Sequence, residues 1–377
     1  MNAERLHAIA DAIRDDFKET NVTSLVEELT TTLQNIIDAP QEGTYQKKLR
    51  DLIENLRIAL TGASSNDFPP TWRQALEELG AADLFGTALL KQIDEIFARN
   101  QITPAVANEE LSKLNNRLEQ FQNSINEMRG AFTKLGIGEE ELQPGTAELG
   151  LLIPREFVNN KLDGFAKELK EDDRIFGAFS EVATGSRPGF KIHSISSSAL
   201  TVFLELVHSK TAACIATAVA GVIGIYKTLL DIRKLKAEAE EKGLPAPVLK
   251  GFDEHADSLM TQGIDDLVER LLAQYYQSED GGRRNELKIE LKYSLHAIAG
   301  RIDRGFNIEV RAKRSAEESE EQRQANDEDF AAIQNAKQNL EFLKAEGTPI
   351  LTLPAGKPDV KTNDENADSE GKRPRKK

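Results

Sequence analysis

The sequence predicts a predominantly α-helical α+β protein, with an N-terminal helical bundle followed by a small antiparallel sheet packed by long helices. Three observations support this class. Apolar residues recur at helical spacing throughout residues 1–145, alternating apolar runs begin near residue 146, and a long uncharged helix-like stretch follows those runs. With 377 residues, the chain is long enough for two or three domains.

Composition and charge indicate a soluble protein. Hydrophobic residues make up 39% of the chain and charged residues 29%, as is typical of helix-rich soluble proteins. The formal net charge of −15 opposes non-specific binding to nucleic acid or to an anionic membrane. The single cysteine, Cys214, cannot form a disulfide within the chain. Because the charged N-terminus also lacks the features of a signal peptide, we expect a cytoplasmic protein.

Residues 1–145 are predicted to be a helical region without strands. Two pairs in this region have the spacing of capping boxes, namely Ser24 with Glu27 and Thr71 with Gln74. They predict that one helix begins near Ser24 and that a shorter one begins near Thr71.

The strongest helical period lies in a coiled-coil-like helix over residues 104–135, in which apolar residues recur at alternating steps of three and four. One interpretation is an intermolecular coiled coil, and the other is packing against the chain's own helices. Phenylalanine in the seam and few complementary charges beside it favour the second. The seam includes Leu111, Leu114, Leu118, Phe121, Ile125 and Met128.

Residues 146–312 are predicted to form an α+β domain. A short strand over Glu148–Ile153 and a helix over Glu156–Leu169 come first, and a strand over Phe306–Arg311 returns to the sheet. Between them lie three β-like runs that turn-forming residues separate: Arg174–Val182, Phe190–Ile195 and Leu200–Leu206. We expect an antiparallel meander that leads directly into a central apolar helix over residues 209–240.

This central helix carries an uncharged run of sixteen residues, Thr211–Tyr226. The run is shorter than the ~20 apolar residues that a membrane span needs. Its small residues Ala212, Ala216, Ala220 and Gly224 stand four apart and form a ridge that another backbone can approach closely. We therefore expect a buried core helix. One alternative is a surface that becomes exposed under a trigger and then binds a membrane or forms an oligomer. The other alternative is a constitutive membrane span.

Beyond residue 312, we expect a charged linker over 313–329, although an exposed helix is an alternative there. A C-terminal helix and a short strand at Ile350–Leu353 are predicted within residues 330–354, and a disordered tail over 355–377. The last seven residues hold five bases, which favours a solubilising tail over a contact with nucleic acid.

Patterns that carry chemistry are weak in this chain. No glycine-rich phosphate loop is present and the histidines are scattered, so we expect no cofactor and no metal. Asp253 and Asp257 lie one helical turn apart, which we interpret as a solvated helix face. Asp280, Glu290 and Lys292 resemble the acid and Glu-x-Lys pattern of restriction-type nucleases, but apolar residues at helical spacing around them favour a helix.

We therefore expect a non-enzymatic interaction or scaffold protein that acts through helical surfaces. The interaction candidates are the ridge and the seam, and the partner is a second protein or another copy of the chain. Two alternatives stay open: a conditional membrane effector that exposes Thr211–Tyr226, and a metal-dependent nuclease.

Overall fold

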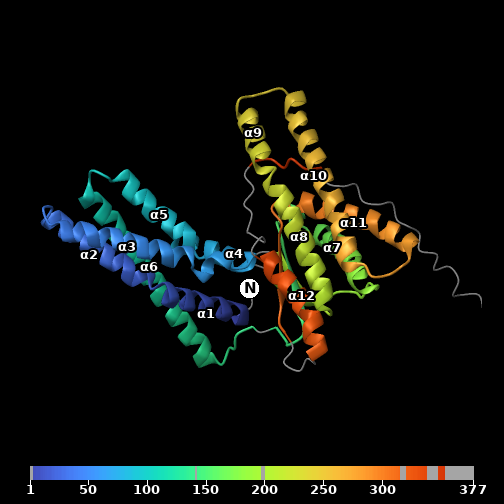
Figure 1. Ribbon diagram of the computed structural model, residues 1–377, viewed down its shortest axis with the longest axis horizontal. Helices are drawn as coiled ribbons and strands as arrows, with labels where there is room; N and C mark the ends of the chain where they lie inside the picture. The colour runs from blue at the N-terminus through green and yellow to red at the C-terminus, as the bar shows by residue number, and fades with distance from the viewer. Residues whose placement is uncertain (1–2, 141, 197–199, 315–319, 338–346, 353–377) are drawn as a thin grey trace, which may run out of the picture.

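A computed structural model describes residues 3–140, 142–196, 200–314, 320–337 and 347–352 (Figure 1). The described residues form twelve α-helices, two short 3-10 helices and one four-stranded antiparallel sheet. The prediction of a mostly helical α+β fold is therefore confirmed. The helices of the N-terminal half form one lobe, and the sheet with the remaining helices forms a second lobe beside it (Figure 1).

The N-terminal lobe is a helical bundle with an apolar core of its own, and its longest helix has the bounds that the sequence predicts. That helix, α6, packs along α1, α2 and α5. The helices are α1 (Ala3–Thr20), α2 (Val22–Asp38), α3 (Gly43–Thr61), α4 (Pro70–Glu78), α5 (Gly86–Arg99) and α6 (Pro104–Leu135), with 3-10 turns at Ser64–Asp67 and Ala82–Leu84.

Neither predicted capping box begins a helix. Helix α2 begins at Val22, after Asn21 in the left-handed conformation, so Ser24 lies inside the first turn. Helix α4 begins at Pro70, which has the fixed φ suited to a first helical position. Thr71 therefore lies within the helix, and its N–H and hydroxyl both donate to the carboxylate of Glu309, far away in the sequence.

The sheet of the C-terminal lobe contains four of the five β runs that are predicted within residues 146–312. Its order is β2-β3-β1-β4, and every pair of neighbouring strands is antiparallel. The strands are β1 (Ala147–Ile153), β2 (Lys191–Ser196), β3 (Leu200–Leu206) and β4 (Asn307–Ala312).

The fifth β prediction, Arg174–Val182, is wrong, because these residues lie within helix α7 (Leu162–Thr184). Ile175, Phe179 and Val182 are buried and recur at steps of four and three, which is helical spacing. The same helix begins six residues later than predicted, since the described backbone from 156 to 161 forms turns.

Five further helices follow α7: α8 (Ser209–Lys227), α9 (Leu230–Glu241), α10 (Ala246–Tyr275), α11 (Gly281–Ile302) and α12 (Glu320–Lys337). The predicted central helix over 209–240 is therefore two helices, which Thr228 and Leu229 separate. Residues 320–329 of the predicted linker belong to α12. Residues 350–352 form no strand, and Leu353, residues 338–346 and the predicted tail over 355–377 lie outside the described residues.

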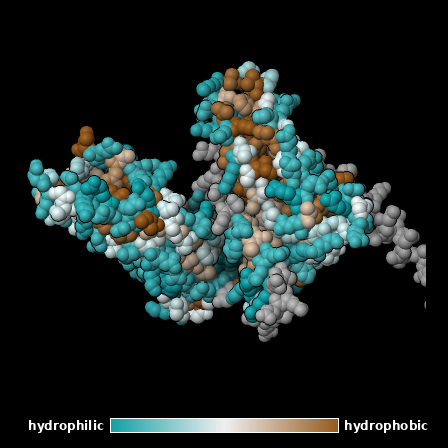
Figure 2. Space-filling model, viewed as in Figure 1, coloured by the Kyte–Doolittle hydropathy of each residue, from teal (hydrophilic) through white to brown (hydrophobic). Residues whose placement is uncertain are grey.

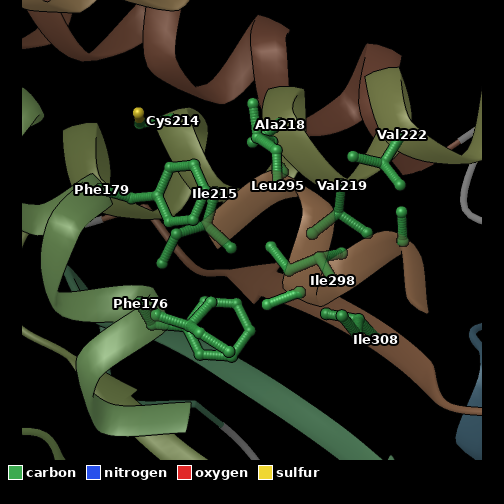
Figure 3. Packing of buried hydrophobic residues seen from close by; sticks show 14 of the residues in the cluster. Phe176, Phe179, Cys214, Ile215, Ala218, Val219, Val222, Leu295, Ile298 and Ile308 are labelled. Carbon is green, nitrogen blue, oxygen red and sulfur yellow. The ribbon is translucent and has the colours of Figure 1, made fainter. Parts of the chain in front are cut away.

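One face of the sheet packs on α7, α8 and α11 in a single apolar core. Figure 3 shows Phe176 and Phe179 of α7 beside Ile215 and Val219 of α8, with Ile298 of α11 close to them. Within the described residues, α8 alone is long and apolar enough to cross a membrane by length and composition, and 61% of its apolar window is buried inside the protein.

Two glycines let α8 and α10 approach closely. A Cβ on Gly221 of α8 would lie 2.7 Å from a methyl carbon of Leu267, and a Cβ on Gly263 of α10 would lie 2.8 Å from Ile225. Gly224 lies one turn further along α8 and has no atom within 4 Å of the corresponding position. The close approach of the two helices therefore needs Gly221 and does not need Gly224.

We predict that Gly221→Ala lowers the free energy of unfolding by about 1–2 kcal/mol, because overpacking outweighs the gain in helix propensity. The matched variant Gly224→Ala, in the same helix, is expected to raise it by up to about 1 kcal/mol. Urea unfolding followed by circular dichroism measures both. If the two variants were stabilised equally, the close packing of α8 on α10 would be wrong.

Candidate interaction surface

Helices α9 and α10 form a hairpin that projects from the C-terminal lobe (Figure 1). Its outer end is apolar and open to solvent. Leu244 is 42% exposed and Val248 is 47% exposed. Figure 2 shows hydrophobic residues gathered at this end of the hairpin. We call Leu244 and Val248, with the loop between α9 and α10, the hairpin tip.

Local backbone chemistry forms the turn at the hairpin tip. Gly243 adopts φ 69°, the left-handed conformation that commonly ends a helix, and the Leu244 N–H donates to the Ala239 carbonyl at 3.0 Å. Pro245 then precedes α10, and Pro247 lies in its first turn. The turn therefore holds Leu244 at the outer end of the hairpin, where no other described element covers it.

The base of α9 is fixed to the lobe by buried cations. Arg233 donates to Asp303 Oδ1 at 2.6 Å and to the Tyr226 hydroxyl at 2.6 Å. Lys236, one turn further on, donates to Asp253 at 2.8 Å. Asp253 is thus an ion-pair partner whose side chain stays 33% exposed. The hairpin consequently has a fixed base and an open tip.

The small-residue ridge of α8 is only partly available to a partner. Ala212 and Ala216 are fully buried in the core, and Ala220 is half-buried against it. Gly224 is exposed. The buried half of the ridge therefore belongs to the packing of the lobe itself.

The seam of α6 packs within the N-terminal bundle. Leu111, Leu114, Leu118 and Ile125 are buried in its core, and Phe121 and Met128 are partly buried against that core. Figure 1 shows α6 running alongside α1 and α2. Helices of the same chain therefore already cover these interaction candidates.

The two lobes meet at a buried charge network on the second face of the sheet. Arg5 of α1 donates to Glu140 at 2.5 Å and to Glu148 of β1 at 3.1 Å, and its guanidinium lies 3.2 Å from the Phe203 ring centroid. Arg311 donates to Glu148 at 2.5 Å. Because these carboxylates are paired and accept hydrogen bonds, they can be buried at the junction.

A second carboxylate cluster lies between α7 and α11. Arg301 donates to both oxygens of Glu168, at 2.5 and 3.1 Å, and lies 3.7 Å from Asp172. Asp172 is buried, and its Oδ2 has no hydrogen-bond partner among the described residues. Burial and the nearby charge of Glu168 raise the pKa of the Asp172 carboxyl well above its usual value.

The nuclease-like residues do not form a nuclease site. Asp280 caps the N-terminus of α11 by accepting the Arg283 N–H at 3.0 Å, and Glu290 and Lys292 lie on that regular helix. Glu290 pairs with Arg187, and Lys292 pairs with Asp265 at 2.6 Å. The strand that would place these side chains around Mg²⁺ is a helix, so the basis for the nuclease hypothesis is lost.

Other candidate chemistry is limited within the described part of the chain. No group of three or more His, Cys, Asp or Glu side chains there has an arrangement that holds a metal ion. Cys214 is fully buried, and burial raises the pKa of its thiol.

Helical periodicity does not reveal the hairpin tip, because its apolar residues lie in and beside a turn and not on one continuous helical face. The signal was nevertheless present in the segment from Gly243 to Val248, GLPAPV. Apolar residues beside a glycine and two prolines in a turn indicate an apolar loop, and loops lie at the surface.

We predict that Asp172→Asn stabilises the protein at neutral pH. A carboxyl whose pKa is raised by folding contributes its stability below its unfolded pKa, and this contribution is lost as the pH rises through the folded pKa. Asparagine removes the buried negative charge and keeps the shape of the side chain. Thermal unfolding should therefore show a higher Tm for the variant at pH 8, and a gap that narrows toward pH 4.

The matched control for this prediction is Asp163→Asn, at an exposed position of the same helix. Its Tm should follow that of the unmodified chain at each pH. Equal pH profiles for the unmodified chain and Asp172→Asn would contradict the burial of a disfavoured carboxylate.

Comparison with known proteins adds no constraint on function. No family model, no curated protein and no solved structure matches this chain. The function proposed below therefore depends on the geometry of this chain alone.

Proposed function

We propose that this chain is an interaction protein that binds a protein partner through the hairpin tip. The observation that supports this proposal is the pair of exposed apolar side chains Leu244 and Val248 at the end of a fixed helical hairpin. Exposed apolar patches of this kind commonly mark sites that bind other molecules. The partner that suits the tip offers an apolar groove, as in helix-in-groove recognition.

The charges around the tip favour a protein over a lipid surface. Charges of both signs flank the tip in the sequence, and Lys250 is paired with Glu254 at 2.9 Å. A tip that bound anionic lipid would need an excess of basic residues, whereas the whole chain carries a net charge of −15. The alternative of a membrane effector would also require α8 to leave the core, and no contact in the structure favours this.

We predict that the double variant Leu244→Asp, Val248→Asp weakens partner binding or self-association by about tenfold or more, because buried apolar anchors supply most of the energy of an interface. Light scattering over a range of concentrations measures self-association. Affinity capture of the tagged chain from cells that express it, followed by titration of the purified partner, measures binding.

The matched control is Ile58→Asp, at an apolar position of α3 that is 65% exposed and lies on the other lobe. This variant should bind as the unmodified chain does. The proposal would be wrong if the chain were strictly monomeric without any partner, or if the double variant bound as well as the control.

A further inference from the structure

Residues Gly347–Thr352 form an irregular segment, with bends at residues 347, 348 and 351, that lies along α9, α10 and the end of α11. We call this segment the strap. It belongs to no helix or strand, and its backbone pairs with none of the four strands. The groups that bind it are side chains of the folded lobe.

Charged side chains hold the main chain of the strap at five of its six residues. Arg233 donates to the Gly347 carbonyl at 2.6 Å, and Lys236 donates to the Pro349 carbonyl at 3.2 Å. Further along, Arg304 donates to the Leu351 carbonyl at 3.0 Å. Main-chain atoms are common to every peptide, so this part of the recognition does not depend on side chains of the strap.

Asp303 divides its two oxygens between the lobe and the strap. Oδ1 accepts hydrogen bonds from Tyr226 at 2.7 Å and from Arg233 at 2.6 Å. Oδ2 accepts the N–H groups of Ile350 and Leu351, at 2.7 and 2.8 Å. The fully buried carboxylate is therefore held in position by the lobe, and its second oxygen is directed at the strap.

Side chains of the strap add specificity at defined positions. Ile350 and Leu351 are 1% and 5% exposed and join the apolar core. Gly347 has φ +79°, and a Cβ there would lie 3.2 Å from Ala237, so the first position requires glycine. Thr352 donates its N–H and its hydroxyl to the two oxygens of Asp257. Asp257, like Asp253, thus has a hydrogen-bond partner while it stays partly exposed.

A pocket of about 430 Å³ borders the strap. Gly347 and Pro349 line one side of it, and Phe157, Pro154 and Arg304 line other parts. A peptide whose side chain at the third position was larger than that of Pro349 would have room on this side.

We propose that the groove between α9, α10 and the end of α11 is a binding site for a non-helical peptide, which the strap fills in cis. The ligand is a partner's peptide of the same chemistry: a glycine, then two adjacent apolar residues with free N–H groups at the fourth and fifth positions. The groove is preorganised, since bonds within the lobe already position Arg233, Asp303 and Lys236. This site is separate from the hairpin tip, so the failure of either proposal leaves the other intact.

The first experiment measures amide hydrogen exchange in the unmodified chain. A bound ligand in cis opens locally, whereas a core segment opens only on unfolding. The amides of Ile350 and Leu351 should therefore exchange at least tenfold faster than the protected amides of α8. Equal exchange rates would overturn the proposal, because the strap would then be part of the cooperative core.

The second experiment adds a fluorescent peptide of the strap sequence, GTPILT, to the full chain and follows anisotropy. In the double variant Ile350→Asp, Leu351→Asp, whose own strap no longer fits the core, the peptide should bind at least tenfold more tightly than to the unmodified chain. Adding Asp257→Asn should weaken this binding. The control peptide carries N-methylleucine at its fifth position, which removes the N–H that Asp303 accepts, and should bind at least tenfold more weakly.

Equal binding of the two peptides, or no binding to a double variant that retains the circular dichroism of the unmodified chain, would overturn the proposal. Should the double variant not fold, the exchange rates of the unmodified chain decide. The chain could instead form a dimer in which the groove of each copy binds the strap of the other copy. That result would make a second copy the ligand of the groove and would overturn the proposal that a partner's peptide binds there.

Discussion

Helix α8 is apolar on nearly every side, and the need to keep it from water organises the C-terminal lobe. Eleven of its nineteen residues are buried. Helices α7, α10, α11 and α12 surround it, and the sheet covers the side that remains (Figure 3). Since α10 must lie close to α8, glycines occur where the two helices would otherwise collide. The long amphipathic helices after α8 therefore serve to shield this one apolar helix from water.

The second face of the sheet is polar and is nevertheless buried, because the N-terminal lobe covers it with matching charges. Glu148 meets Arg5 and Arg311, and Glu309 meets the first turn of α4 through Thr71. The N-terminus of a helix favours a carboxylate, so α4 suits Glu309. Removing one partner of such a pair costs more than the pair itself contributes. The lobes are thus joined by specific charges and not by a common apolar core.

Sequence periodicity predicted most helices and strands, because burial on one side produces a period in the chain itself. It failed where the deciding contact is distant. Thr71 has the spacing of a capping residue, but its partner lies in β4. Residues 350–352 have the composition of a strand, yet side chains from α10 and the end of α11 hold them without a ladder. The hairpin tip could not be predicted in this way, because a periodic apolar pattern indicates only which residues can be buried. Which apolar residues stay exposed depends on how the helices are arranged in the fold.

Helix α9 links the two proposed surfaces. Its outer end leads into the hairpin tip, and its first half carries Arg233 and Lys236, which bind both the lobe and the strap. A peptide that kept the bonds to these two cations would leave the hairpin in place. One that lacked them would remove the bonds between the strap and α9, close to the helix break at Thr228. Because both ligands act on the same helix, any change in its position on binding couples their affinities in both directions.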